Sequence, residues 1–333
     1  MTYHLGIDVG GTKTEALIAD EGGQAVGYGF AGPGNWEVVG YDGLARAVHA
    51  ATADALAMAG APIEGVVTAG MGIGGFDWPC QYARHRDALK SLHLRNAPVI
   101  VNDAALGIPA GSEEGWGVCI ESGTSCNCRG WTRNRAREGR AIGGHGRWSG
   151  EAAGGLDIVA RAMRAVSFQW SRRGPATALS RAFLRACGAG SLDELVEWTY
   201  LGRFTLDQGL VAVVFDVARG GDPPAQEVMR WAGAQLGDMA CGVIRQLELQ
   251  SEAFDLVLIG SIYNGHPLIE QTLRETVLAT APYARIVRFE LPPVIGGVLL
   301  GMQALGMDTA SLRDRLLCTA REVMGIPGLS CRR

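Results

Sequence analysis

Two short segments of the chain have the residue types needed to hold phosphate groups. The first is Asp8-Val9-Gly10-Gly11-Thr12-Lys13-Thr14, and the second is Glu121-Ser122-Gly123-Thr124-Ser125. In each segment an apolar strand leads to an acidic residue, and a Gly-Thr turn follows. Glycine lets the backbone approach an anion closely because it has no Cβ, and successive backbone N–H groups can form a concave anion seat. Two such turns facing each other could grip the phosphates of one ATP.

The first segment is the stronger signal. Asp8 stands at the end of a strand, where it could hold a magnesium-bound water, since Mg²⁺ favours a few carboxylates together with water and phosphate. The segment is not a Walker loop because no Gly-Lys-Ser/Thr sequence closes it. A plain hairpin with a Gly-Gly turn is the alternative, which the second segment makes less attractive. The residues that we expect to contact the nucleotide phosphates and Mg²⁺ are Asp8, Gly10, Gly11, Thr12, Lys13, Thr14, Gly123, Thr124 and Ser125.

Asp103 is the candidate catalytic base. It lies where the apolar strand Val99–Val101 becomes a helix, so it faces the open end of a sheet. A carboxylate at such a place can accept the proton of a hydroxyl group as that hydroxyl attacks a phosphate. Asp103 could also simply cap the helix, and the two roles are compatible.

The pattern of strands and helices indicates a duplicated α/β fold. Three short strands, His4–Asp8, Glu15–Asp20 and Ala25–Phe30, are followed by strands and helices in alternation, and a similar order restarts near Trp116. Repeats of this kind commonly form two similar domains with a cleft between them. We expect domains at residues 1–113 and 114–306, the second larger because of helical insertions. A C-terminal helix and tail at 307–333 would pack back on the first domain.

With these motifs in this order, the chain resembles the N-acetylglucosamine kinase and BadF/BadG-type ATPase family, within the actin, hexokinase and heat-shock-chaperone ATPase superfamily. The resemblance follows the family's order along almost the whole chain. Its segments are Gly6–Asp20, Gly34–Trp36, Asn102–Ala105, Ser122–Cys128, Gly146–Trp148, Leu258–Ser261 and Ile295–Gly297. It implies two ribonuclease H-like domains, each a mixed sheet flanked by helices, and an interdomain cleft.

The resemblance also implies a function. It implies an ATP- and Mg²⁺-dependent kinase that phosphorylates the 6-hydroxyl of an amino sugar, most simply N-acetylglucosamine, with Asp103 as the base and a homodimeric assembly. Planar amides suit sugar hydroxyls and an N-acetyl group because they carry both donors and an acceptor. The implied sugar contacts are Asn35, Trp36, Asp103, Asn127, Gly146, Trp148 and Glu151. The implied adenosine contacts are Gly260, Ser261 and Asn264.

Two departures from the family pattern leave the substrate open. Ser125 replaces the second glycine of the second phosphate loop. The family also has an acidic pair after its Trp-Gly, and the aspartate of that pair, which helps to position the sugar, is here either missing or replaced by Glu151. Glucosamine or another hexose therefore remains an alternative substrate. A BadF-type ATPase that switches a partner protein, or a sugar sensor without turnover, would share the nucleotide residues.

Composition narrows the function classes. The net charge is −4 over 333 residues, whereas nucleic-acid binders usually carry a basic face. The four residues Arg133, Arg135, Arg137 and Arg140 alternate with neutral residues, which indicates a solvated loop. The apolar stretch 291–307 is too short and too interrupted by Pro and Gly to span a membrane. Eight cysteines without regular spacing and no visible signal peptide favour reduced thiols in a cytoplasm.

Two further patterns are weaker. Gly70–Gly75 satisfies the dinucleotide fingerprint G-x-G-x-x-G, but Pro79 follows closely, no helix opens there, and no acidic strand end lies about twenty residues on. We expect this segment to be a loop of the sugar cleft. Cys126 and Cys128, with His145, could bind a metal, but the spacing is unusual for one. Buried thiols on a strand are the preferred interpretation.

Overall fold

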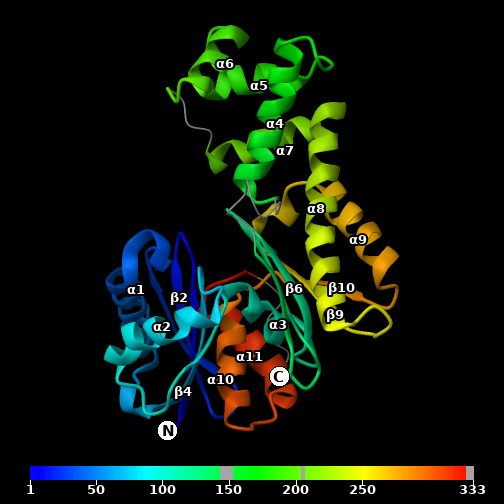
Figure 1. Cartoon of the computed structure of the whole chain (residues 1–333). Helices are drawn as coiled ribbons and strands as arrows, with labels where there is room; N and C mark the ends of the chain where they lie inside the picture. Colours follow the sequence, from blue (N-terminus) through cyan, green and yellow to red (C-terminus); the bar gives the residue numbers. More distant parts are fainter. Residues whose placement is uncertain (143–152, 204–206, 328–333) are drawn as a thin grey trace.

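The computed structural model describes residues 1–142, 153–203 and 207–327. Two five-stranded sheets form the base of the molecule, and a group of helices projects from it (Figure 1). The strand orders are β3-β2-β1-β4-β5 and β8-β7-β6-β9-β10, so the second sheet repeats the first strand for strand. The duplicated α/β architecture expected from the sequence is therefore confirmed. We refer below to the first and second lobes, each built on one of these sheets.

The first sheet combines an antiparallel meander with two parallel strands. Its strands are β1 (Tyr3–Val9), β2 (Thr14–Asp20), β3 (Ala25–Ala31), β4 (Val66–Ile73) and β5 (Val99–Val101). β1 pairs antiparallel with β2 and parallel with β4. This register places Asp8 between Glu15 on β2 and Gly72 on β4.

Helices cover both faces of the first sheet. α1 (Trp36–Ala59) packs its buried residues on one face, and Gly60 in the left-handed conformation ends it. α10 (Val294–Ala304) and α11 (Ala310–Val323), which come from the far end of the chain, pack on the other face. α10 approaches so closely that a Cβ on Gly70 would lie 2.2 Å from the Gly297 carbonyl oxygen. Gly70 and Gly72 thus lie within β4 as packing glycines, and no dinucleotide turn begins there.

The second sheet has the same plan with a large insertion. Its strands are β6 (Gly117–Ser122), β7 (Cys126–Trp131), β8 (Glu138–Ile142), β9 (Asp255–Ile259) and β10 (Arg285–Arg288). The long helix α8 (Pro223–Leu247) covers one face and packs against α9 (Pro267–Thr280). The prediction of a loop up to Arg140 was wrong, because Arg140 lies in β8 and pairs with Arg129 of β7.

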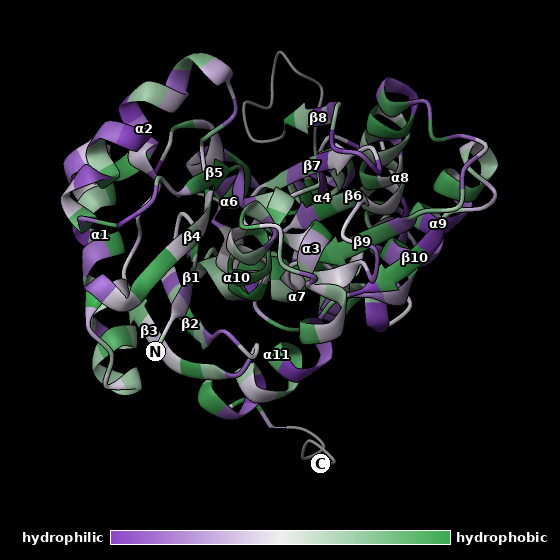
Figure 2. Cartoon of the chain, turned by 90° about the horizontal axis from the view of Figure 1, so that it is seen from below, coloured by the Kyte–Doolittle hydropathy of each residue, from purple (hydrophilic) through white to green (hydrophobic). Residues whose placement is uncertain are grey.

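Two helices exchange between the lobes. α3 (Gly107–Gly111) follows the first sheet in the sequence but packs on the second, where a Cβ on Gly107 would lie 2.3 Å from Cys119 Sγ. α10 makes the reverse crossing. Seen from below, α3 and α10 lie side by side between the two sheets (Figure 2). Leu106 and Leu300 share one buried cluster with Val257, so the crossing forms a common core for the two lobes.

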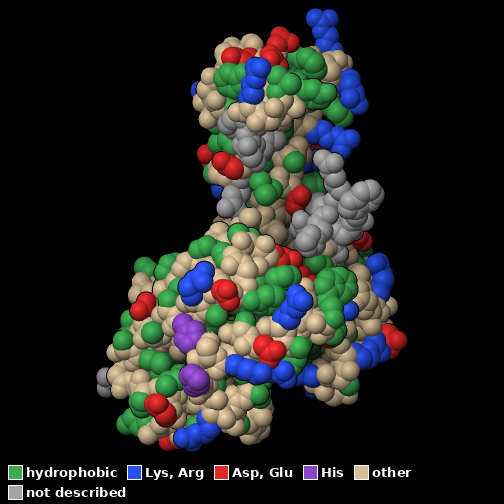
Figure 3. Space-filling view, turned by 60° about the vertical axis from the view of Figure 1, so that its left-hand side comes forward, with side chains coloured by type: hydrophobic (Ala, Val, Ile, Leu, Met, Phe, Trp, Pro, Cys, Tyr) green, Lys and Arg blue, Asp and Glu red, His purple; other side chains and the backbone are tan. Residues whose placement is uncertain are grey.

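The helical projection accounts for the greater size of the second half. It consists of α4 (Gly155–Trp170), α5 (Ala178–Cys187), α6 (Leu192–Tyr200) and α7 (Val211–Arg219). Figure 3 shows it as a narrow column above the broad base. The shorter elements are α2 (Tyr82–Leu89) and the 3₁₀ turns η1 (Ile63–Gly65), η2 (Pro79–Gln81), η3 (Lys90–Leu92), η4 (Asp103–Leu106), η5 (Gln208–Leu210) and η6 (Ser261–Asn264).

Candidate active site

Three carboxylates from the two lobes influence one another at the ends of their strands. Burial raises the pKa of Asp8 well above its usual range, and nearby Asp103 and Glu15 add to the rise. Burial likewise raises the pKa of Glu121 at the end of β6, with Asp103 and Asp8 adding to it and Lys13 opposing it. Asp8 and Lys13 border the first Gly-Thr turn and Glu121 precedes the second, so charged groups beside the first turn act on the carboxylate beside the second.

The first turn has an open, exposed backbone. Gly10 N–H donates to the Lys13 carbonyl oxygen over 2.8 Å, which closes the turn and leaves Gly11 and Thr12 exposed. A Cβ on Gly11 would meet no heavy atom within 4 Å. Lys13 Nζ lies 2.6 Å from Glu15 Oε2. Thr14 is placed differently, since its hydroxyl is buried and has no partner among the described residues.

The second turn has the same openness. Gly123 N–H donates to the Ser125 carbonyl oxygen over 2.9 Å, and Thr124 and Ser125 are exposed. Gly123 has open space where a Cβ would stand. Ser125 is not among the residues with positive φ, so serine in the place of the family's glycine causes no left-handed backbone strain.

The expected adenosine residues lie beside the second turn. β9 ends at Ile259, and Gly260 has a φ of 104° with a would-be Cβ only 2.1 Å from the Ser122 carbonyl oxygen. Only glycine fits this approach of the β9 end to the β6 end. Ser261 and Asn264 are exposed on η6, and Asn264 Oδ1 accepts a hydrogen bond from Arg288 over 2.7 Å.

Asp103 lies two residues beyond β5, at the start of η4. The Ala104 N–H donates to Asn102 Oδ1 over 3.1 Å and to Asp103 Oδ1 over 3.0 Å, so Asn102 caps the turn and Asp103 shares the donor. Burial raises the pKa of Asp103 to about 6. The Ala104 N–H opposes the rise, Asp77 adds to it, and Arg129 opposes it. Near neutral pH this carboxylate is therefore both ionised and able to take up a proton.

Asn35 lies close to Asp103 across one backbone turn. A Cβ on Gly74 would lie 2.9 Å from Asp103 Oδ2 and 3.6 Å from Asn35 Nδ2. Trp36 supports this turn from its side, since its indole N–H donates to the Gly75 carbonyl oxygen over 2.9 Å and its ring stacks on Tyr41. The Gly74–Gly75 turn therefore borders the predicted sugar residues.

The second lobe contributes Asn127 to the same region. Its Nδ2 lies 3.4 Å from Asp77 Oδ1, while its buried Oδ1 has no partner among the described residues. Gly146, Trp148 and Glu151, the remaining predicted sugar contacts, lie outside the described residues, as does His145. Cys126 and Cys128 are buried on β7, as the sequence suggested.

Sequence reasoning missed two buried charges next to Asp103. Asp77 is 8% exposed and pairs with Arg129, which is 1% exposed. They line a cavity of about 410 Å³ together with Trp78, Asn102 and Arg140. Two local signals were available in the sequence. One is an aspartate in the breaker-rich turn after β4, and the other is an arginine in the middle of a short strand with no other charged residue. The sequence already showed Glu121 as the acidic residue before the second Gly-Thr turn. Its raised pKa, however, depends in part on Asp103 and Asp8, which are distant in the sequence.

The oxygen ligands suit a hydrated Mg²⁺ ion. Asp8 and Glu121 are hard ligands whose charged forms are disfavoured by burial and by Asp103, so a cation between them and a phosphate would be stabilised. Across residues 1–142, 153–203 and 207–327 no group of three or more His, Cys, Asp or Glu side chains is arranged to hold a metal ion.

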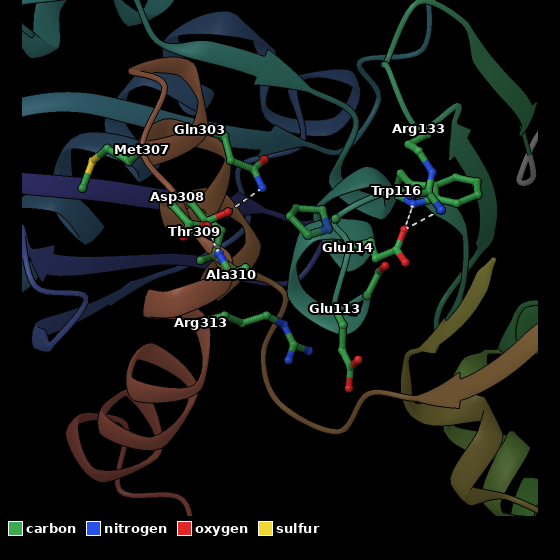
Figure 4. A pocket seen from close by; sticks show the side chains of 14 residues that line it. Glu113, Glu114, Trp116, Arg133, Gln303, Met307, Asp308, Thr309, Ala310 and Arg313 are labelled. Atoms are coloured by element: carbon green, nitrogen blue, oxygen red, sulfur yellow. Dashed lines mark hydrogen bonds and ion pairs between the residues drawn. The ribbon is translucent and has the colours of Figure 1, made fainter. Parts of the chain in front are cut away.

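A second cavity, of about 430 Å³, lies away from all of these residues (Figure 4). It is lined by the linker between the lobes and by the start of α11. Trp116 Nε1 donates to Glu114 Oε2 over 2.6 Å, and Arg133 lies 2.9 Å from the same oxygen. Arg313 faces the cavity from α11 and donates to the Ala110 carbonyl oxygen over 2.7 Å.

Comparison with known proteins identifies the class to which this fold and site belong. The model of the BadF/BadG/BcrA/BcrD ATPase family matches residues 5–301, and the chain belongs to this family. The resemblance recognised in the sequence is therefore confirmed, and ATP is the nucleotide that the family name specifies.

Curated relatives narrow the comparison to sugar kinases. The chain is 25% identical to the N-acetylmuramic acid/N-acetylglucosamine kinase of Clostridium acetobutylicum, over 90% of this chain and 98% of that protein. It is 27% identical to the N-acetyl-D-glucosamine kinase of Dictyostelium discoideum, with the same coverage. Both names agree with the predicted enzyme class, an ATP-dependent carbohydrate kinase.

Solved structures confirm the fold. A ROK family glucokinase from Streptomyces griseus, in complex with glucose and AMPPNP, has a TM-score of 0.58 at 20% identity and covers 90% of this chain and 99% of that one. A structure provisionally assigned as an N-acetylglucosamine kinase from Chromobacterium violaceum has a TM-score of 0.66 at 24% identity, with coverage of 90% and 98%. Within the described part of the chain, no helix combines the length and apolar character required to cross a bilayer.

Proposed function

We propose that this protein transfers the terminal phosphate of ATP to a hydroxyl group of an amino sugar, most simply the 6-hydroxyl of N-acetylglucosamine. The observation that carries the proposal is the environment of Asp103. A half-buried carboxylate with a pKa of about 6 lies across one turn from Asn35 and faces the carboxylates that border the two Gly-Thr turns. A general base for a sugar hydroxyl requires this combination of reach and proton affinity.

On the sugar side, Asp103 accepts the hydroxyl proton, and its shared hydrogen bond with Ala104 keeps the carboxylate oriented. Asn35 and Asn127 approach the sugar from the two lobes. The unpartnered Oδ1 of Asn127 supports this role, because a buried acceptor without a donor is unfavourable unless a ligand supplies one. The acetamido group and the hydroxyls of the sugar offer such donors.

On the nucleotide side, the open backbone at Gly11 and Gly123 and the exposed hydroxyls of Thr12, Thr124 and Ser125 hold the phosphates. Gly260, Ser261 and Asn264 contact the adenosine. When bound, Mg²⁺ supplies positive charge that neutralises the phosphate oxygens, and Asp8 holds it through water. Closing the lobes over both substrates excludes water, which protects ATP from hydrolysis.

A substrate panel tests this proposal. Purified protein is incubated with Mg·ATP and N-acetylglucosamine, N-acetylmuramic acid, glucosamine, glucose or no sugar, and ADP release is coupled to mass spectrometry of the sugar. We expect ADP release that depends on N-acetylglucosamine and yields one phosphosugar. Sugar-independent ADP release with no phosphosugar would instead favour an ATPase switch. Equal turnover of glucose and the acetylated sugars would remove the amino-sugar assignment.

A further inference from the structure

Asp77 lies at the centre of a buried hydrogen-bonding network that joins the two lobes. It belongs to the turn after β4 in the first lobe, and its Oδ1 accepts a hydrogen bond from the guanidinium of Arg129 on β7 of the second lobe. The same oxygen accepts from Asn102 Nδ2 over 3.1 Å and from Asn127 Nδ2 over 3.4 Å. One carboxylate therefore binds both the residue that precedes Asp103 and a predicted sugar contact from the opposite lobe.

The backbone around Asp77 is held from both lobes as well. Gln81 Oε1 accepts hydrogen bonds from the N–H groups of Asp77 and Trp78, over 2.8 and 2.9 Å. From β8 of the second lobe, Arg140 donates to the Asp77 carbonyl oxygen over 3.0 Å, and its guanidinium lies 4.9 Å from the centre of the Trp78 ring. The turn is therefore hydrogen-bonded to both lobes.

Asn102 links this network to the candidate base. Its Nδ2 donates to Asp77, and its Oδ1 accepts from the Ala104 N–H, which also donates to the Asp103 carboxylate. A change in the orientation of Asn102 would therefore alter the first turn of η4 and with it the direction of Asp103. Displacements of about 1 Å at a reacting group can cost about a hundredfold in rate.

Stability alone does not account for this ion pair. Replacing a buried pair by apolar residues of similar volume is often neutral or stabilising, since desolvation offsets much of the attraction. The pair here also leaves Arg129 Nε without a partner among the described residues. Its geometry, with donors from both lobes converging on one oxygen, supports a role in the relative placement of groups.

We propose that Asp77, paired with Arg129, is a positioning residue that holds the Asn102–Asp103 turn of the first lobe in register with Asn127 of the second. This inference rests on the proposed function, since the groups that it positions are the base and a sugar contact. Asp77 acts through Asn102 and Asn127 and has no direct part in the chemical step.

The test uses a double variant, because Asp77→Asn alone would leave the buried charge of Arg129 unpaired and could unfold the protein. Asp77→Asn/Arg129→Gln removes both charges and keeps hydrogen-bonding groups at both positions. The matched control is Asp87→Asn/Arg86→Gln, which neutralises an exposed pair on α2 with a separation of 3.2 Å. Thermal melting first establishes that each variant is folded.

We expect the double variant to lower kcat for the sugar by about 10- to 100-fold, with the KM for ATP within about threefold of the wild-type value. A merely structural defect would not separate these two constants, because none of the hydrogen bonds of Asp77 described above involves the two Gly-Thr turns. The control pair should leave both constants unchanged. A folded double variant with wild-type kcat would refute the positioning role. So would a folded variant in which the KM for ATP rises by as large a factor as kcat falls.

Hydrogen exchange provides a readout that does not need turnover. In the double variant, peptides that cover residues 99–106 and 126–131 should exchange faster than in the wild type, while those from α8 should not. Unchanged exchange in both segments would also refute the inference. If the wild type phosphorylates no sugar, the proposed function fails, yet the exchange experiment still decides whether Asp77 holds these segments.

Discussion

The two lobes repeat one strand order but place opposite charges at the equivalent sheet edge. In the first lobe the outer parallel strand, β5, leads to the carboxylate of Asp103, whose pKa burial raises to about 6. In the second lobe the corresponding strand, β10, ends in Arg288, whose guanidinium lies 4.8 Å from the centre of the Tyr263 ring and donates to Asn264. The duplicated fold supplies the same sheet edge twice, and the side chains near the strand end determine its use.

This difference separates the two tasks of a kinase. The acidic edge faces Asn35 and the carboxylates at the Gly-Thr turns, so it suits proton transfer from an acceptor hydroxyl. The basic edge at Arg288 organises η6, where the adenosine is expected, and β9 separates it from β6, the strand that leads to the second Gly-Thr turn. Changes at the first edge should therefore affect the chemical step, and changes at the second should affect nucleotide affinity.

Removing the carboxylate of Asp103 should have the largest effect on turnover. Asp103→Asn keeps the shape of the side chain and an oxygen for the Ala104 N–H, but it cannot take up the hydroxyl proton. We expect kcat to fall by about 10²–10⁴-fold, the usual contribution of a general base, with little change in the KM for ATP. Steady-state kinetics at saturating sugar measure this.

The control for that variant is Asp87→Asn, a change of the same kind at an exposed position on α2. It should leave kcat within about twofold of the wild type, since surface changes away from a site are usually small. Near-wild-type turnover in Asp103→Asn would eliminate this residue as the base and with it the functional contrast between β5 and β10.

The raised pKa of Asp103 also predicts that the reaction rate depends on pH. Asp103 acts in its ionised form, and its pKa is about 6 where an ordinary aspartate has about 4. Protonation therefore inactivates the base as the pH falls, and kcat/KM should drop by about tenfold for each unit below about pH 6. A pH profile that stays flat down to pH 5 would contradict this, as would an acid limb that persists unchanged in Asp103→Asn.

The sequence was sufficient for the parts of this site that are encoded locally. The strand–turn–strand units at Asp8–Thr14 and Glu121–Ser125 are contiguous, so residue types and spacing reveal them. The cap of the turn that follows β5 is local as well, although Asn102 and not Asp103 is the N-cap residue. β8 was missed because its first residues, Glu138-Gly139-Arg140, have little strand character, and its pairing with β7 determines its conformation.

The remaining features depend on contacts far apart in the chain. Asp77 and Arg129 are 52 residues apart, and neither segment alone indicates that the two charges meet. Gly70 and Gly72 imitate a nucleotide fingerprint, but Gly70 is set by the approach of α10, more than 220 residues later. The effect of Asp103 and Asp8 on the pKa of Glu121 likewise arises only when the two lobes come together.

A change at Arg288, on the β10 edge, should have the smallest effect, and it tests most directly whether the β5 and β10 edges have different tasks. Arg288 donates to Asn264 Oδ1 over 2.7 Å and lies over the Tyr263 ring, two contacts that a lysine does not reproduce together. Losing a hydrogen bond from a charged donor costs about 1.5 kcal/mol. Arg288→Lys should therefore raise the KM for ATP by about three- to tenfold, with kcat and the KM for the sugar unchanged.

Arg274→Lys, on the exposed face of α9 with Glu270 as its partner, is the matched control and should change none of the three constants. If Arg288→Lys instead altered the KM for the sugar and spared that for ATP, the nucleotide would have to be placed nearer to the first lobe's edge.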